Sequence, residues 1–356
     1  MKRTPLAALA LLGLLSGCAP TPCTFADEPL GTLTDWEDAW LEAGGAPESP
    51  SFDILTAEDG LALAYRDWVP PGWTGEGPVA VLVPGSSSHS EHYAQLGATL
   101  SEDGVYTRIL DVRGHGRSVC ESATSCDAPD HTPRQPADDG RYYPGRVGDS
   151  ADADQLVRDL DRHLTHLHDL WPDASAHLVG HSSGGGLVSR YVENTGASGL
   201  ASVSLLAPYN HPDQPQVREA VRLQCERYAG TDYARLDLGA LGDALRGNLH
   251  RYVLTFHKGD TLTDPLDTLA YTWATVQGMA TRDPDHFWTA HTAPLLFIAA
   301  ENDHLLDPME SSRQVGRAAG PHRFVEMPDT SHIGLAWSAS VGHEVAAHIH
   351  DHSHTP

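Results

Sequence analysis

The sequence is poor in positive charge and in cysteine, and its most apolar stretch is short. Of its 356 residues 23 are basic and 48 are acidic, which gives a formal net charge of −25. Nucleic-acid-binding proteins and polybasic proteins of lipid surfaces need the opposite sign, so both classes are excluded. Hydrophobic residues still make up 40% of the chain, enough for a large core, and the length allows one or two domains.

The apolar stretch Leu6–Leu15 follows the basic pair Lys2-Arg3 and is too short to span a bilayer as a stable helix. It ends in Leu15-Ser16-Gly17-Cys18, which resembles a bacterial lipobox. The resemblance implies cleavage before Cys18 and acylation of that cysteine, and Ala19 in the next position resembles the outer-membrane sorting pattern. An ordinary secretory signal with an incidental cysteine is the alternative.

We therefore expect residues 1–17 to be a lipoprotein signal peptide and residues 18–50 to be a tether rich in Pro, Thr, Gly and Glu. Several acyl chains anchor a protein firmly. The expected location is that of an exported bacterial lipoprotein at the outer membrane, facing the periplasm or the cell surface. Within the tether, Trp36 and Trp40 are expected in a short helix that docks back on the body.

Export places the remaining cysteines in an oxidising compartment, where pairing is favoured. Cys120 and Cys126 lie six residues apart in a loop, so we expect a local disulfide between them. A bond between Cys23 and Cys225 is the remaining option. No Cys-x-x-Cys occurs, so redox or zinc-ribbon chemistry has no support.

Apolar runs of strand length alternate with helical patterns along most of the chain. Strands are predicted at 52–69 (an antiparallel hairpin broken at 58–60), 78–83, 106–111, 176–179, 201–206, 294–300 and 323–327. Helices are predicted at 88–102, 150–170, 187–192 and 335–349. This alternation predicts an α/β fold with a mostly parallel sheet and helices on both faces, from which only the first hairpin departs.

Residues 209–290 interrupt the alternation between two core strands. Helical patterns within them, at 217–228, 236–251 and 266–279, predict a helical cap over the strand ends. The core is then expected to comprise residues 51–208 and 291–356, and its second part ends in a His-rich tail.

The strongest chemical signal is Gly180-His181-Ser182-Ser183-Gly184. This Gly-x-Ser-x-Gly sequence follows a predicted strand and precedes a predicted helix, which is the setting of a nucleophile elbow. Its glycines allow the strained turn that exposes the Ser182 hydroxyl, and the Ser183 N–H at the helix N-terminus can stabilise an oxyanion. A turn that only packs the helix on the strand is the alternative.

A serine nucleophile needs a base, and the base needs an orienting acid; in this architecture the order is Ser, acid, His. Asp303 lies three residues past the strand 294–300 and is the predicted acid. Asp307 is the alternative, although Asp307-Pro308 suits a helix cap, and Glu301 is less favoured. His332 is the predicted base, because it alone among 22 histidines follows the last strand and directly precedes the last helix.

Two further motifs carry a resemblance to a known family. Val83–Tyr93 resembles the oxyanion-loop stretch of the monoacylglycerol lipase and lysophospholipase group of α/β-hydrolases, also called serine aminopeptidase-like. Asp111–Ser118 resembles the Asp-x-Arg-Gly-His-Gly-x-Ser turn of that group. The resemblance covers residues 52–208 and 292–349, and the cap shows no match, which leaves substrate choice open.

Carried over to this chain, the resemblance implies a triad of Ser182, Asp303 and His332. It also implies an oxyanion hole made by the backbone N–H groups of Ser86 and Ser183. One departure is that the group usually has His-Gly where this chain has Pro84-Gly85. Proline lacks an N–H, but the implied donor follows Gly85, so the hole can survive.

Several other residues have structural explanations. Arg113 and His115 occupy a tight turn, and a bulky residue such as His181 is ordinary before a nucleophile. Three cap aromatics either line an acyl channel or hold the small core of the cap: Trp273, Phe287 and Trp288. The tail histidines can bind metal weakly, but no metal site and no cofactor is predicted; they are His343, His348, His350, His352 and His354.

A serine nucleophile supports acyl transfer, in which Ser182 attacks a carbonyl, His332 takes the proton and water resolves the acyl-enzyme. The sequence therefore predicts a membrane-anchored serine esterase or lipase. A monoacylglycerol or a lysophospholipid fits both anchor and cap. The runner-up is a peptidase or amidase acting on small substrates. A non-catalytic surface lipoprotein that binds a ligand or partner is the alternative from another class.

Overall fold

The computed structural model describes residues 33–119, 140–218, 227–228, 232–257 and 264–353. The predicted signal peptide and lipidation site Cys18 lie outside these residues, and so do the predicted disulfide Cys120–Cys126 and the pair Cys23 and Cys225. None of the helices in the described ranges has the length and apolarity that a membrane crossing requires.

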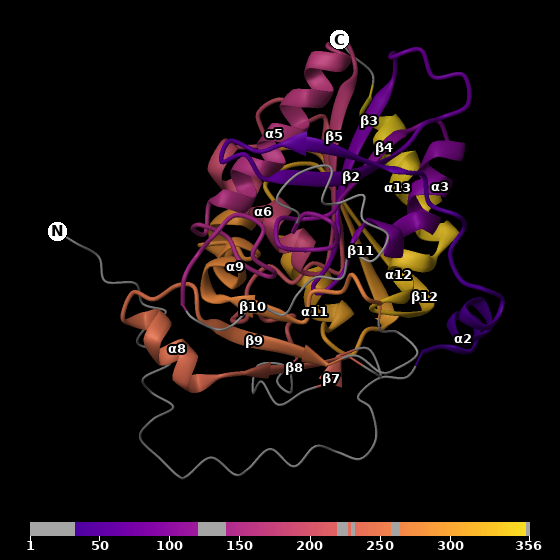
Figure 1. Ribbon diagram of the computed structural model, residues 1–356. Coiled ribbons are helices and arrows are strands. Elements are labelled where there is room, and N and C mark those ends of the chain that lie inside the picture. The colour runs from indigo at the N-terminus through magenta and orange to yellow at the C-terminus, as the bar shows by residue number, and fades with distance from the viewer. Residues whose placement is uncertain (1–32, 120–139, 219–226, 229–231, 258–263, 354–356) are drawn as a thin grey trace.

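An eight-stranded sheet forms the centre of the molecule (Figure 1). Its strands, in spatial order, are β1 (Phe52–Thr56), β2 (Ala62–Trp68), β4 (Tyr106–Leu110), β3 (Pro78–Val83), β5 (Ser175–His181), β6 (Ser202–Leu206), β11 (Leu295–Asn302) and β12 (His322–Ser331). β2 runs antiparallel to both β1 and β4, and every other neighbouring pair is parallel. The mostly parallel sheet predicted from the sequence, with its exceptional first hairpin, is confirmed.

Helices cover both faces of the sheet, because its strands are apolar on both sides. One face packs against α5 (Gln155–Leu170), α6 (Ser183–Thr195) and α10 (Pro284–Ala290), and the other against α3 (Ala94–Glu102), α12 (Gly334–Trp337) and α13 (Ala339–Asp351). In β3, Val79, Val81 and Val83 enter the first core, whereas Ala80 and Leu82 enter the second. Successive side chains of a strand point to opposite faces, so this short apolar run serves two cores.

The insertion between β6 and β11 is mixed in structure, which corrects the predicted helical cap. It contains a second sheet of β10 (Ala270–Thr272), β9 (Tyr252–His257), β8 (Asp232–Leu236) and β7 (Arg227–Tyr228), together with α8 (Leu238–Leu245), α9 (Trp273–Gly278) and α10. Figure 1 shows this sheet in orange, apart from the central one. The predicted helical patterns at 236–251 and 266–279 each contain a short helix, but α8 lies between the strands β8 and β9, and α9 directly follows the strand β10. Tyr252–His257 is rich in residues of high strand propensity, which favours a strand there.

A helix near the start of the described residues, α2 (Asp35–Glu42), docks on the body, as expected for the segment around Trp36 and Trp40. Trp40 stacks on Trp337 of α12 with ring centroids 4.9 Å apart. Trp36 Nε1 donates to the carbonyl oxygen of Asp329, at 2.5 Å. This end of the predicted tether is therefore part of the folded body.

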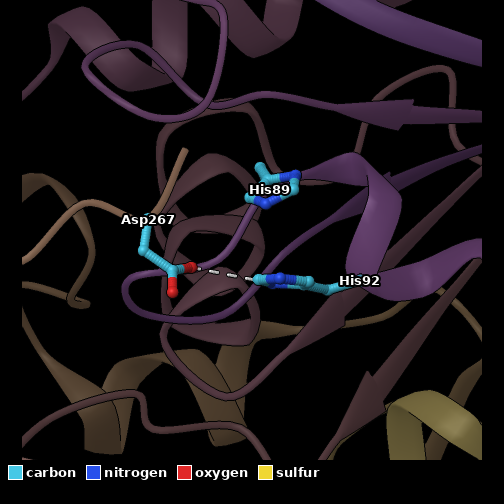
Figure 2. A group of neighbouring side chains, drawn as sticks. All are labelled: His89, His92 and Asp267. Carbon is cyan, nitrogen blue, oxygen red and sulfur yellow. Dashed lines mark ion pairs between the residues drawn. The ribbon is translucent and has the colours of Figure 1, made fainter. Parts of the chain in front are cut away.

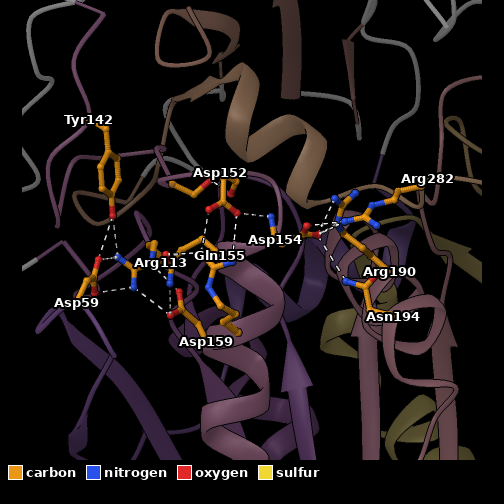
Figure 3. Close-up of polar contacts among 12 residues, drawn as sticks. Asp59, Arg113, Tyr142, Asp152, Asp154, Gln155, Asp159, Arg190, Asn194 and Arg282 are labelled. Atoms are coloured by element: carbon orange, nitrogen blue, oxygen red, sulfur yellow. Dashed lines mark hydrogen bonds and ion pairs between the residues drawn. The ribbon is translucent and has the colours of Figure 1, made fainter. Parts of the chain in front are cut away.

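Ion pairs made by the buried arginines Arg113 and Arg190 fix α5 against its neighbours (Figure 3). Arg113 Nε donates to Asp159 of α5 at 2.6 Å, and Arg113 Nη1 donates to Asp59 in the β1–β2 turn at 2.7 Å. At the start of the same helix, Asp154 accepts from Arg190 of α6 at 2.9 Å. Arg113 thus ties together a hairpin and a helix, which agrees with the structural role predicted for it.

Candidate active site

Ser182 occupies the sharp turn between β5 and α6. Its backbone φ is +53°, a left-handed value that is uncommon outside glycine. A Cβ on Gly184 would lie 2.2 Å from the carbonyl oxygen of Val83, and a Cβ on Gly180 would lie 2.7 Å from that of Gly184. The two glycines of the Gly-x-Ser-x-Gly sequence are therefore sterically required for this turn.

Three predicted residues from separate loops meet at the turn. His332 Nε2 lies 2.9 Å from Ser182 Oγ, and His332 Nδ1 lies 2.8 Å from Asp303 Oδ2. An ionised carboxylate only accepts, so Nδ1 donates to Asp303 and Nε2 can accept from the Ser182 hydroxyl. All three are buried, with exposed fractions of 9% for Ser182 and 3% for Asp303 and His332. The group offers a hydroxyl, a base for its proton and an acid that orients the base.

Asp303 is held in its ionised form although it is buried. Burial raises the pKa of Asp303. The interactions with His332, His304 and the Leu306 N–H lower the pKa by more than burial raises it, so the net shift is downward. Asp303 Oδ1 accepts from the N–H groups of Leu305 and Leu306 at 2.8 and 2.9 Å. One carboxylate oxygen is thus fixed by backbone, which leaves the other for His332.

The two alternative acids lie elsewhere. Asp307 caps α11 (Pro308–Val315) by accepting from the Glu310 N–H at 3.0 Å. Glu301 accepts from the Asp329 N–H at 2.8 Å in an exposed position. The structure therefore brings Asp303, rather than either alternative, to His332.

The two residues predicted to form the oxyanion hole are neighbours in space. Ser86 Oγ donates to Ser183 Oγ at 2.9 Å. Ser183 is the first residue of α6, so its N–H belongs to the positive end of the helix. Pro84, which stands where the family usually has histidine, does not displace this loop. The Gly85 N–H donates to the Tyr93 hydroxyl at 2.8 Å, and Ser86 lies beside Ser183.

A chain of hydrogen bonds that was not predicted joins the oxyanion loop to the His332 loop. His181 Nε2 lies 3.0 Å from the carbonyl oxygen of His332 and donates to it. The Tyr93 hydroxyl lies 2.7 Å from His181 Nδ1 and donates to it, while accepting from Gly85. Burial, and then the charge of His332, lower the pKa of His181 to about 3, so it stays neutral. His181 is a positioning residue, more than the bulky neighbour expected from the sequence.

A second unpredicted support comes from α2. Glu37 is 0% exposed; its Oε1 accepts from the Ser331 N–H and its Oε2 from the Thr34 N–H, both at 2.8 Å. A Cβ on Gly334 would overlap Glu37 Oε1, at 1.6 Å. Glu37 therefore touches the backbone on both sides of His332. The capping-box spacing of Thr34 and Glu37 is the only sequence signal for this residue.

The cap contacts the oxyanion loop through Tyr271 of β10. The Tyr271 hydroxyl accepts from the Ser87 N–H at 2.7 Å and lies 2.6 Å from His115 Nε2. His115 Nδ1 donates to the Arg113 carbonyl oxygen at 3.0 Å, so Nε2 accepts from Tyr271. Burial lowers the pKa of His115 to about 4, so its ring is neutral. The structural role predicted for His115 agrees with these contacts.

Two of the cap aromatics belong to the main core. Phe287 and Trp288 are 1% and 0% exposed and pack in the same cluster as Phe297 of β11. Trp273 packs against the small cap cluster around Leu241 and Val253. These positions favour the core alternative over an acyl channel.

Three histidines of the His-rich tail lie on α13, which are His343, His348 and His350; His352 follows the helix as its C-cap, and His354 lies outside the described residues. His343 Nδ1 lies 2.6 Å from Asp103 Oδ2, and His350 Nε2 donates to the Asp103 carbonyl oxygen at 2.7 Å. His348 is buried, and burial lowers its pKa to about 4. The helix predicted over 335–349 is interrupted at Ser338, whose hydroxyl accepts from the Val341 N–H.

A family of known sequences matches most of the chain. The sequence profile of the family described as serine aminopeptidase, S33, matches residues 77–335. The non-heme chloroperoxidase CPO-A1 of Kitasatospora aureofaciens is 30% identical over 154 residues, which are 43% of each chain. This chain thus matches less than half of the length of that relative.

Solved structures share the fold at low sequence identity. A soluble variant of monoglyceride lipase from Saccharomyces cerevisiae is 14% identical with a TM-score of 0.61, over 87% of this chain and 97% of that one. A carboxyl esterase from Bacillus coagulans is 14% identical with a TM-score of 0.58, over 86% and 100%. With the central sheet and the profile match, the conclusion is that this chain belongs to the serine aminopeptidase S33 family of α/β-hydrolases.

Proposed function

We propose that this protein is a serine hydrolase that cleaves carboxylic esters, with lipid acyl esters as the substrate class. The observation that carries the proposal is the buried series Ser182–His332–Asp303, with contacts of 2.9 and 2.8 Å. Family membership supports hydrolysis, and structural relatives named as a lipase and an esterase support an ester over an amide.

In the proposed reaction, Ser182 Oγ attacks the ester carbonyl carbon while His332 Nε2 takes its proton. The N–H groups of Ser86 and Ser183 donate to the oxyanion that forms. The intermediate collapses, and His332 returns the proton to the leaving alcohol. Water then attacks the acyl-enzyme with His332 again as base, which releases the acid and restores Ser182. Asp303 stays ionised and orients His332 throughout.

The test is hydrolysis of p-nitrophenyl esters from acetate to dodecanoate by residues 19–356, beside matching p-nitroanilides. We expect ester cleavage that falls more than about 10³-fold in Ser182→Ala and about 10³–10⁴-fold in Asp303→Asn. Asp307→Asn is the matched control, with activity within about twofold. Faster cleavage of the anilides would favour an amidase. A folded parent that cleaves neither would favour a binding protein.

The proposed location is the bacterial outer membrane, through acylation of Cys18. The lipobox-like Leu15-Ser16-Gly17-Cys18 after a short apolar stretch supports this. Cells that express the full chain, grown with a clickable fatty acid, should label the parent and fail to label Cys18→Ser. Equal labelling of the two would contradict the anchor without bearing on the esterase proposal.

A further inference from the structure

Two histidines and an aspartate lie together where the oxyanion loop meets the cap. His89 directly precedes η2 (Ser90–Tyr93), His92 lies within it, and Asp267 precedes β10. One ligand atom of each lies within 4.8 Å of the others. Figure 2 shows the Asp267 carboxylate facing the His92 ring, with the His89 ring beside them. We propose that these three residues, with Asp264, form a site for a divalent transition-metal ion of the zinc class.

His89 is the clearest sign of a missing ligand. It is 1% exposed, and neither ring nitrogen makes a hydrogen bond within the described part of the chain. Its Nε2 lies 3.4 Å from Asp264 Oδ1, an ion-pair distance. His115, which is also 1% exposed, bonds both ring nitrogens. An unsatisfied buried polar atom is unfavourable, and a metal–nitrogen bond would remove that cost.

Carboxylate oxygens lie beside both histidine rings. The Asp267 side chain is fully buried, with Oδ2 accepting from the Asp264 N–H at 2.9 Å and Oδ1 lying 3.9 Å from His92 Nδ1. The carboxylates of Asp264 and Asp267 together carry two negative charges, which a divalent ion would balance.

The donor types select the class of ion. Imidazole nitrogen with carboxylate oxygen suits zinc and its transition-metal neighbours, whereas calcium and magnesium prefer oxygen alone. Zinc bonds of about 2.0–2.2 Å in a tetrahedron place donor atoms about 3.4 Å apart. The His89–Asp264 contact is already 3.4 Å. The donor atoms of His89, His92 and Asp267 lie within 4.8 Å of one another and need to approach by at most about 1.4 Å.

Such an ion would fasten the cap to the oxyanion loop. Two hydrogen bonds already join these segments: Thr268 N–H to the Ser87 carbonyl oxygen at 3.3 Å, and Ser87 N–H to the Tyr271 hydroxyl at 2.7 Å. The proposed ligands lie beside these bonds in sequence, on both segments. The site goes beyond the proposed esterase reaction, because it holds the cap and takes no part in acyl transfer. No motif spacing predicts this site, because Asp267 lies far along the chain from His89 and His92.

The test is zinc binding by residues 19–356, stripped with a chelator and followed by calorimetry and by the visible absorption of bound cobalt. We expect one tight ion per chain, weakened about 100-fold or more in His89→Ala and Asp267→Asn. His92→Gln, at a partly exposed position, is a second variant for which weaker zinc binding is also expected. His343→Ala and His350→Ala are matched controls on the tail, and they should retain the tight site.

Circular dichroism of each metal-free variant separates loss of the site from loss of the fold. No tight zinc site in a folded parent would overturn the proposal, and so would loss of the site only in the tail variants. Equal affinity for calcium or magnesium would overturn the assignment to the zinc class. The readout is binding rather than ester hydrolysis, so failure here is distinct from failure of the proposed function.

Discussion

Glu37 on α2 provides a strict test of how the N-terminal helix supports His332. Its two carboxylate oxygens accept from the N–H groups of Ser331 and Thr34, and the side chain is fully buried. Replacement by glutamine keeps the size of the side chain but leaves only one acceptor oxygen. One backbone N–H then loses its acceptor and faces an amide donor.

The size of the effect follows from these contacts. A hydrogen bond to a charged group contributes about 1.5–3 kcal/mol, so Glu37→Gln should lower the free energy of unfolding by about 2–3 kcal/mol. Glu37→Ala loses both bonds and leaves a cavity, so about 3–5 kcal/mol is expected. If about 1.4 kcal/mol of the loss falls on the placement of His332, kcat/KM decreases about tenfold.

The assay combines urea unfolding with steady-state ester hydrolysis. Glu42→Gln is the matched control, because Glu42 lies on the same helix and is exposed. Control and parent should agree within about 0.5 kcal/mol. Equal stability and equal kcat/KM of Glu37→Gln and Glu42→Gln would refute the idea that α2 holds the His332 loop.

Three further perturbations test other contacts. Tyr93→Phe removes the hydroxyl that bridges the Gly85 N–H and His181 Nδ1. It should lower the free energy of unfolding by about 1–3 kcal/mol and also lower kcat. An unchanged kcat would contradict the positioning role of His181. Arg113→Met leaves the buried Asp159 carboxylate without its ion-pair partner. Chemical unfolding should then show a free energy of unfolding lower by about 3–5 kcal/mol. A decrease below about 1 kcal/mol would contradict the structural role of Arg113. Burial is the largest cause that lowers the pKa values of five buried histidines to about 3 or 4, and these are His115, His177, His181, His291 and His348. Unfolded histidines bind protons below about 6.5, so stability should fall with pH from there towards 4, by up to about 1.4 kcal/mol per pH unit for each; a urea midpoint that is constant from pH 7.5 to 5 would contradict this.

Local patterns in the sequence were sufficient to predict the central sheet and the three residues that meet at its edge. Apolar runs such as Pro78–Val83 coincide with strands, because a strand buried on both faces has few polar residues. Ser182 and His332 could be placed because each lies between a strand and a helix, where parallel strands bring loops to one edge. Asp303 was distinguished from Asp307 by its distance from the strand end.

The contacts that support the site could not be predicted in the same way. Glu37 and Ser331 are 294 residues apart, and the contact between Tyr93 and His181 spans 88 residues. Neither contact leaves a periodic pattern in the chain. The cap strands are short and flanked by helix-like patterns, so propensity alone predicted helices where pairing between strands prevails.

The central claim is that Ser182 is an activated nucleophile. The most direct measurement is labelling of residues 19–356 with a fluorophosphonate, followed by mass spectrometry of the modified peptide. Phosphonylation needs an activated serine and does not require knowledge of the substrate. We predict one adduct, located on Ser182, that is absent from Ser182→Ala and strongly reduced in a variant without the His332 ring. A folded parent that stays unlabelled, or an adduct on another serine, would contradict the claim.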